Sequence, residues 1–189
     1  VSVYAPEVYA KAKELFEERI SQGIFVEDKQ SAYYIYQLEM NGRTQTGIAA
    51  CASVDDYLDG TIKKHENTRE EKEQDRIRHV DTLSAQTGPI FLAYRSQATI
   101  NQLVSKIMET QEPLYDFTAA DGIAHRMWKV TEEAVTTLQE AFAGIQEIYI
   151  ADGHHRSAAA ALVGAEKAKQ NPNHRGDEEY NYFMAVCFP

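Results

Sequence analysis

The first half of the chain contains two amphipathic segments separated by two short apolar ones. Residues 6–22 carry apolar side chains at close to helical spacing with charges between them, which predicts a surface helix. Residues 32–39 and 45–53 are rich in β-branched, aromatic and small apolar residues, and the polar residues 41–43 between them are typical of a hairpin turn. Residues 68–85 are highly charged with a narrow apolar stripe, which predicts a long helix that packs along one face only.

The second half of the chain alternates between strand-like and helix-like patterns. Strands are expected at 89–94, 114–119, 124–130, 147–150 and 181–188, and helices at 100–109, 131–142 and 157–169. Strands interleaved with helices are typical of an α/β protein, and the hairpin adds antiparallel pairs, so we expect helices packed on a mixed (α+β) sheet. We expect a single domain over 1–189, with the helix and hairpin in 1–60 and a motif-bearing core in 61–189. The chain starts at Val1 and stops at Pro189, directly after a strand-like run, so we expect it to be a fragment of a longer protein.

Charge and cysteine usage narrow the class of protein. Nineteen basic against 29 acidic residues give a net charge of −10, which disfavours a nucleic-acid or acidic-membrane binder because such partners need a basic surface. A local basic site for a phosphorylated small molecule is still compatible with this charge. Cys51 and Cys187 lie in apolar runs without CxxC spacing, so we expect buried free thiols. No apolar run approaches the roughly 20 residues that cross a bilayer, and no signal peptide is evident, so we expect a cytoplasmic protein.

The segment IYIADGHHR, residues 148–156, combines an apolar strand with residues suited to phosphate binding. Gly153 permits positive φ and close approach of a ligand, and the following helix start offers unpaired N–H groups. His154 and His155 add donors, and Arg156 adds a planar fork for phosphate oxygens. Asp152 is suited to hold Mg²⁺ or to orient a hydroxyl. A plain Asp-Gly turn and a different metal site are the alternatives that the local chemistry leaves open, although no HExxH pattern supports zinc.

A second group of candidate residues lies at the start of the long charged helix. His65 and Glu66 precede the helix. Helical spacing places four residues within one or two turns on a shared face, with Asp75 beside them: Arg69, Lys72, Arg76 and His79. Arg69 and Arg76 are the candidate phosphate ligands. The carboxylate of Glu66 is suited to act as a general base, and His65 is placed to tune it. The simpler interpretation is a solvated helix with surface salt bridges. Together with a phosphate-binding segment elsewhere, a carboxylate and cations favour phosphoryl transfer.

Four motifs give the chain a resemblance to a known family. They are KHENTREEKEQDR at 64–76, PIFLAYR at 89–95, DGIAHRMWKV at 121–130 and IYIADGHHRSAAA at 148–160. In this order they resemble a bacterial and archaeal family classified as a domain of unknown function. The DGHHR element is also similar to that of the free serine kinases, which have the ParB/sulfiredoxin-like fold and transfer a phosphoryl group from ATP or ADP to free L-serine.

The resemblance implies a ParB/sulfiredoxin-like core and an activity. It implies that residues 153–156 bind nucleotide phosphates, that Asp152 works with Mg²⁺ or the serine hydroxyl, and that Glu66 corresponds to the catalytic glutamate of those kinases. The chain has neither the Walker pattern GxxxxGK[ST] nor a kinase glycine-rich loop, so a nucleotide would bind by other means. The expected function is a small-molecule kinase with ATP or ADP and Mg²⁺ as cofactors and an amino acid as substrate. The alternative is a nucleotide-binding regulatory module without kinase activity.

Overall fold

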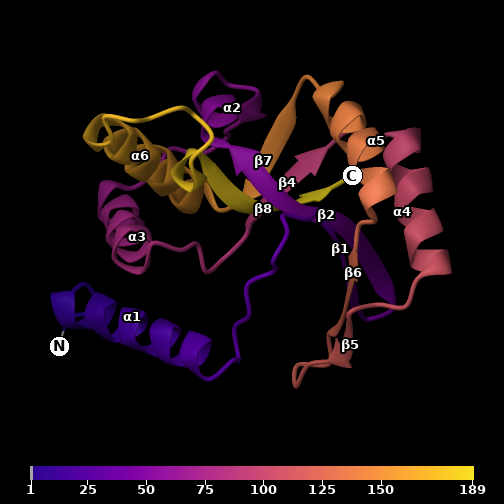
Figure 1. Cartoon of the computed structure of the whole chain (residues 1–189), viewed down its shortest axis with the longest axis horizontal. Coiled ribbons are helices and arrows are strands. Elements are labelled where there is room, and N and C mark those ends of the chain that lie inside the picture. Colours follow the sequence, from indigo (N-terminus) through magenta and orange to yellow (C-terminus); the bar gives the residue numbers. More distant parts are fainter. Residues whose placement is uncertain (1) are drawn as a thin grey trace.

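The hairpin expected from the sequence forms the middle of the sheet in the computed structural model, which describes residues 2–189 (Figure 1). Its strands β1 (Tyr34–Met40) and β2 (Arg43–Ser53) pair antiparallel, with Met40 opposite Arg43. The connecting residues Asn41 and Gly42 have φ values of 53° and 76°. Positive φ at both central residues is the geometry that matches the natural twist of paired strands, so this dipeptide sets the register of the hairpin.

The other strands flank the hairpin on both sides. They are β3 (Ile62–Lys63), β4 (Ile90–Tyr94), β5 (Tyr115–Thr118), β6 (Ala124–Lys129), β7 (Ile148–Asp152) and β8 (Tyr182–Phe188). The order across the sheet is β3-β7-β4-β8-β2-β1-β6-β5. The pairs β3–β7 and β4–β8 are parallel and the remaining pairs are antiparallel. The expected α/β fold with a mixed sheet is therefore confirmed.

Helices cover both faces of this sheet. They are α1 (Pro6–Ser21), α2 (Val54–Leu58), α3 (Glu70–Leu83), α4 (Ala98–Thr110), α5 (Glu132–Ala143) and α6 (His154–Gln170), with a 3₁₀ turn η1 at Glu179–Asn181. Figure 1 shows α3 and α6 together on one side and α4 beside α5 on the other. Met184 of β8 lines the space beside α3 and α6, whereas Ala185 and Cys187 line the cavity beside α5, because successive side chains of a strand point to opposite faces. Within residues 2–189, no helix has the length and apolar character needed to cross a membrane.

Helix α6 lies very close to the structure beneath it, which fixes where its first turn points. Residues 158–161 are all alanine and all buried, so the helix approaches the core without large side chains between them. Further along, a Cβ atom at Gly164 would lie 2.5 Å from the backbone oxygen of Tyr180. No side chain larger than hydrogen fits there without movement of the backbone, so the middle of α6 is held close to the core.

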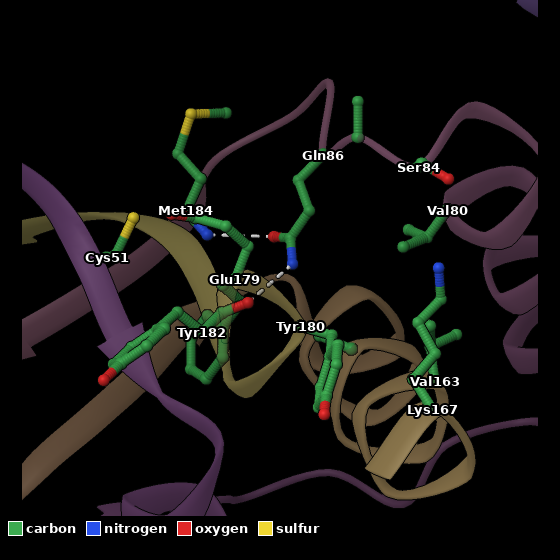
Figure 2. Close-up of a pocket in the computed structure, with 13 residues that line it drawn as sticks. Cys51, Val80, Ser84, Gln86, Val163, Lys167, Glu179, Tyr180, Tyr182 and Met184 are labelled. Carbon is green, nitrogen blue, oxygen red and sulfur yellow. Dashed lines mark hydrogen bonds between the residues drawn. The ribbon is translucent and has the colours of Figure 1, made fainter. Parts of the chain in front are cut away.

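A side chain extends the pairing of β8 just before β4 begins. The Gln86 amide nitrogen donates to the Tyr182 carbonyl at 3.1 Å, and the Met184 N–H donates to the Gln86 amide oxygen at 2.9 Å (Figure 2). These are the two backbone groups that a neighbouring strand would bind, so Gln86 takes the place of a strand residue at this edge. A cavity of about 340 Å³ lies beside it, between α3, α6 and β8, and Cys51 lies on its wall.

The two cysteines differ in environment. Both are free thiols, as expected, but only Cys187 is buried, and burial raises its pKa to about 12. The expectation of a buried thiol is wrong for Cys51, which is exposed on β2. The apolar run that contains Cys51 alternates between the two faces of the sheet, and the face that Cys51 occupies is only partly covered by α3 and α6.

Candidate functional site

Gly153 alone separates strand β7 from helix α6. Asp152 is the last residue of β7, and His154, His155 and Arg156 form the first turn of α6. The sequence-based expectation that the helix begins at residue 157 is therefore wrong. Gly153 has a φ of 100°, and a Cβ atom there would lie 3.1 Å from a side-chain carbon of Ile90. Both the backbone conformation and the available space require glycine at this junction.

The N-terminus of α6 is open to an anion. No side chain of the described residues caps it, so the first N–H groups of the helix point outward without a side-chain acceptor. Unpaired N–H groups and the positive end of the helix dipole favour negative charge at this position. The uncapped start of α6 is consistent with the expected anion site, and the binding of an anion there stays a prediction.

Arg156 is held in place beside this helix start. Its Nη2 atom lies 2.9 Å from Asp152 Oδ2, and a Cβ atom at Gly88 would lie 3.2 Å from its Nη1 atom. The guanidinium group is therefore confined between Asp152 and two glycines, Gly88 and Gly153. An arginine has five N–H donors, so the remaining donors are free to bind a ligand while the ion pair fixes the orientation of the group.

The two histidines connect the start of α6 to the segment that precedes α3. The Nε2 atom of His154 accepts the backbone N–H of His65 at 3.4 Å, a long hydrogen bond, and the Nε2 atom of His155 accepts the backbone N–H of Arg69 at 3.1 Å. An accepting nitrogen carries no proton, which places the hydrogen of each neutral ring on Nδ1. In His154 this Nδ1 atom lies 3.6 Å from Glu66 Oε2. In this arrangement the histidines hold the 65–69 segment through Nε2, and their expected role as phosphate donors stays a prediction.

His154 is neutral in its environment near neutral pH. Its side chain is buried, and burial is the largest cause that lowers its pKa below 6.5, followed by the nearby charge of His65. The carboxylates of Glu66 and Asp152 oppose this effect without reversing it. A neutral imidazole is what the acceptor role of Nε2 requires, so the hydrogen bonding and the titration behaviour agree.

A cavity of about 320 Å³ lies between the first turn of α6, helix α3 and the start of the chain. Among the candidate residues, it brings together Glu66, Arg76 and residues 152–156, which come from segments far apart in the sequence. His65 and Arg69 do not line it. Both contact the site through their backbone N–H groups, and the His65 ring also packs edge-on against the His154 ring, with centroids 4.4 Å apart. The cavity is mostly polar and contains both carboxylates and cations.

Three further residues line this cavity: Tyr4, Lys72 and Asp75. Helical spacing places Lys72 and Asp75 near Arg76 without assigning them a role in binding, whereas Tyr4 was not expected. Asp75 accepts a hydrogen bond of 2.7 Å from the hydroxyl of Tyr9 and lies 3.7 Å from Arg76, so it joins α1 to α3 at the edge of the site. The four-residue spacing of Lys72 and Arg76 is a sequence signal for one shared helix face. No local pattern indicates that the N-terminal tyrosines reach this site, because that contact depends on how α1 packs.

The carboxylates fit only one kind of metal site. Within residues 2–189, no three or more metal-ligating side chains are grouped to hold an ion. Mg²⁺ commonly takes one or two carboxylates and completes its shell with water and substrate phosphates. Asp152 and Asp75, which both line the cavity, suit an ion that arrives with a phosphate, and they do not form a closed cage.

Comparison with known proteins gives one match. A family model described as "Protein of unknown function (DUF1015)" matches residues 2–189, which include all four sequence motifs. Among the curated proteins and the solved structures, none matched the chain significantly.

Proposed function

The chain belongs to the DUF1015 family, and we propose that it is a small-molecule kinase that transfers a phosphoryl group from ATP or ADP to a free amino acid, with L-serine as the first candidate. The proposal includes a ParB/sulfiredoxin-like core, as the motif resemblance implies. One observation carries it: the cavity at the start of α6 places the exposed carboxylate of Glu66 together with Lys72, Arg76 and Arg156 around an uncapped helix N-terminus. Phosphoryl transfer depends mainly on positioning and on positive charge around the phosphates, which this set of groups supplies.

The phosphates of the nucleotide would bind at the first turn of α6. The backbone N–H groups after Gly153 and the free donors of Arg156 point to this position, and Lys72 and Arg76 add positive charge from α3. When Mg²⁺ accompanies the nucleotide, it supplies further neutralisation of the phosphate charge, with Asp152 and Asp75 as the carboxylates that would hold it.

Glu66 would accept the proton of the acceptor hydroxyl. Its side chain is 61% exposed, and its Oε2 atom lies 3.6 Å from Nδ1 of His154. In the proposed step the serine oxygen bonds to the terminal phosphorus, the bond from that phosphorus to the bridging oxygen breaks, and the hydroxyl proton moves to Glu66. The nucleotide leaves with one phosphoryl group fewer, and O-phosphoserine is the second product.

The exposure of Glu66 also favours a second candidate, a nucleotide-binding regulatory module without kinase activity. A general base is most effective when burial and hydrogen bonding fix its position, and a largely exposed carboxylate has neither. A module of this kind would bind the nucleotide at α6 and would not phosphorylate an amino acid.

The direct test is incubation with L-serine, Mg²⁺ and either ATP or ADP, followed by detection of O-phosphoserine by mass spectrometry. Arg156→Ala is expected to weaken nucleotide binding in calorimetry by about 10- to 100-fold, the loss of a charge-assisted hydrogen bond of about 1.5–3 kcal/mol. Glu66→Gln is expected to keep binding and lose turnover. Glu14→Gln is the matched control, because Glu14 is 63% exposed on α1 and lies outside the cavity.

The outcomes separate the candidates. O-phosphoserine formation that depends on Glu66 supports the kinase. Nucleotide binding that depends on Arg156, with no phosphorylated product, supports the regulatory module. Absence of nucleotide binding rejects both, and full activity of Glu66→Gln rejects the assignment of the base.

A further inference from the structure

A second cavity, of about 330 Å³, lies on the open part of the sheet and is almost entirely apolar. We call it the aromatic groove. It lies over β8, β2, β1, β6 and β5, and its lining includes Tyr36, Ala49, Pro89, Phe117 and His125. Its volume is at the lower end of the roughly 300–1,000 Å³ that small-molecule sites occupy. No step of the proposed phosphoryl transfer uses it.

Three rings in the groove form a continuous stack. The ring centroids of Tyr36 and His125 are 6.0 Å apart with planes inclined by 18°, and those of Phe117 and His125 are 5.1 Å apart with planes inclined by 17°. The hydroxyl of Tyr36 and Nδ1 of His125 form a hydrogen bond of 2.7 Å, which fixes both rings. Phe117 is nevertheless 54% exposed, so an aromatic surface that is already oriented is left in contact with solvent.

The aromatic groove begins next to the phosphate-binding site. Pro89 lines the groove, and the preceding residue, Gly88, lies against the Arg156 guanidinium group. Consecutive Cα atoms are about 3.8 Å apart, so the main chain that confines the arginine leads directly into the wall of the groove. A ligand with a phosphate at Arg156 and a flat apolar group at its other end matches this arrangement.

We infer that the aromatic groove holds the base of the nucleotide whose phosphates bind at the start of α6. A purine ring presents large flat faces, and such faces stack on aromatic side chains with little dependence on base identity. The groove contributes almost no polar surface, so it accepts the ring, and the charged phosphates stay with the cations of the polar cavity. The Nε2 atom of His125 is left for the edge of the base, since its Nδ1 is bound to Tyr36. This inference rests on the proposed nucleotide site.

Binding of three ligands distinguishes the contribution of the base from that of the phosphates: ATP, adenosine and inorganic tripolyphosphate. Phe117→Ala removes part of the stack, and Ala49→Leu fills the floor of the groove. Each is expected to weaken binding of ATP and adenosine by about 5- to 100-fold, as measured by calorimetry, and to leave tripolyphosphate unchanged. Arg156→Ala is expected to weaken ATP and tripolyphosphate and to leave adenosine unchanged. Phe25→Ala is the matched control, because Phe25 is also exposed, at 46%, and is paired with one ring, Phe16, at 5.8 Å.

The failures of the two proposals are distinguishable. If ATP binds in an Arg156-dependent manner and neither groove variant weakens it more than Phe25→Ala, the base lies elsewhere and the groove inference is overturned, while the phosphate site stands. If adenosine binds in the groove and tripolyphosphate does not bind at all, the groove inference stands and the proposed function loses its phosphate site. If adenosine does not bind and the protein forms a dimer that Phe117→Ala dissociates, the groove is a contact between copies of the chain, and the inference is overturned.

Discussion

Gly153 provides the sharpest test of how the candidate site is built. Its φ of 100° is nearly matched by the φ of 98° at Gly176, a residue of an exposed turn. A Cβ atom at Gly176 would meet nothing within 4 Å, whereas one at Gly153 would lie 3.1 Å from both the Ile90 side chain and the Arg156 guanidinium group. Substitution of each glycine by alanine therefore imposes a similar backbone cost, and only one of the two substitutions adds crowding.

The magnitudes follow from these two contributions. A left-handed backbone conformation costs an L-residue about 1–2 kcal/mol, which is the loss of stability expected for Gly176→Ala. At Gly153, a methyl group must also displace the fully packed Ile90, and overpacking of this kind costs about 1–3 kcal/mol. The expected loss for Gly153→Ala is thus about 2–5 kcal/mol, a large part of the stability of an ordinary domain.

Urea unfolding followed by circular dichroism measures both losses, with equal slopes as evidence that the same structure unfolds. Calorimetry with inorganic tripolyphosphate then reports on the site itself. Gly153→Ala is expected to weaken this binding, because the new methyl group displaces the Arg156 guanidinium, and Gly176→Ala is expected to bind as the wild type does. Equal losses of stability in the two variants would refute the crowding argument, and no loss in either would refute the conformational one.

Three further predictions concern the parts that hold this site. Below about pH 6.5 the protein is expected to lose stability. Burial, and then the charge of His65, lower the pKa of His154 in the folded state, so the unfolded chain takes up the proton first. In urea titrations between about pH 7.5 and 5, His154→Gln should flatten this dependence of stability on pH. Gly164→Ala is expected to lower Tm by several degrees in calorimetric scans, because its Cβ atom would lie 2.5 Å from a carbonyl oxygen. This crowding outweighs the preference of helices for alanine, which is about 1 kcal/mol. Gly144→Ala would make an ordinary contact of 3.5 Å and should leave Tm nearly unchanged. Gln86→Leu leaves two backbone groups of β8 without partners, which is expected to lower the free energy of unfolding by about 1–3 kcal/mol. Hydrogen exchange measures this loss, and the amide of Met184 should exchange faster in the variant.

The pattern of the sequence predicts most elements and does not predict how they pair. The hairpin was predictable because its turn is a local signal: Asn41 and Gly42 tolerate positive φ. The insertion of β8, the last strand of the chain, between β4 and β2 was not, because strand order depends on contacts between distant segments. The short β3 was missed for the same reason, since its two residues lie in a polar stretch and become a strand only by pairing with β7.

Some residues of the candidate site were likewise predictable from the sequence and others were not. Residues 152–156 stand out in the sequence through their chemistry, and the structure collects them with Glu66 around one cavity. The start of α6 was misplaced because two histidines and an arginine are not a typical first turn, and the turn forms here because the imidazoles find acceptor roles across the site. The participation of Tyr9, which binds Asp75, depends on the packing of α1 on α3, for which no spacing rule exists.

The way in which His154 and His155 bind the segment at 65–69 has a consequence for how this protein can change over evolutionary time. Both imidazoles bind backbone N–H groups, which every residue except proline possesses. The hydrogen bonds that join the two halves of the site therefore do not depend on the side chains at positions 65 and 69, although the His65 ring also packs edge-on against the His154 ring, with centroids 4.4 Å apart. Mutations there can alter the chemistry presented near the cavity while the segment stays attached, so relatives with different acceptor molecules could arise from one scaffold. Only a substitution to proline at either position is expected to detach the segment directly.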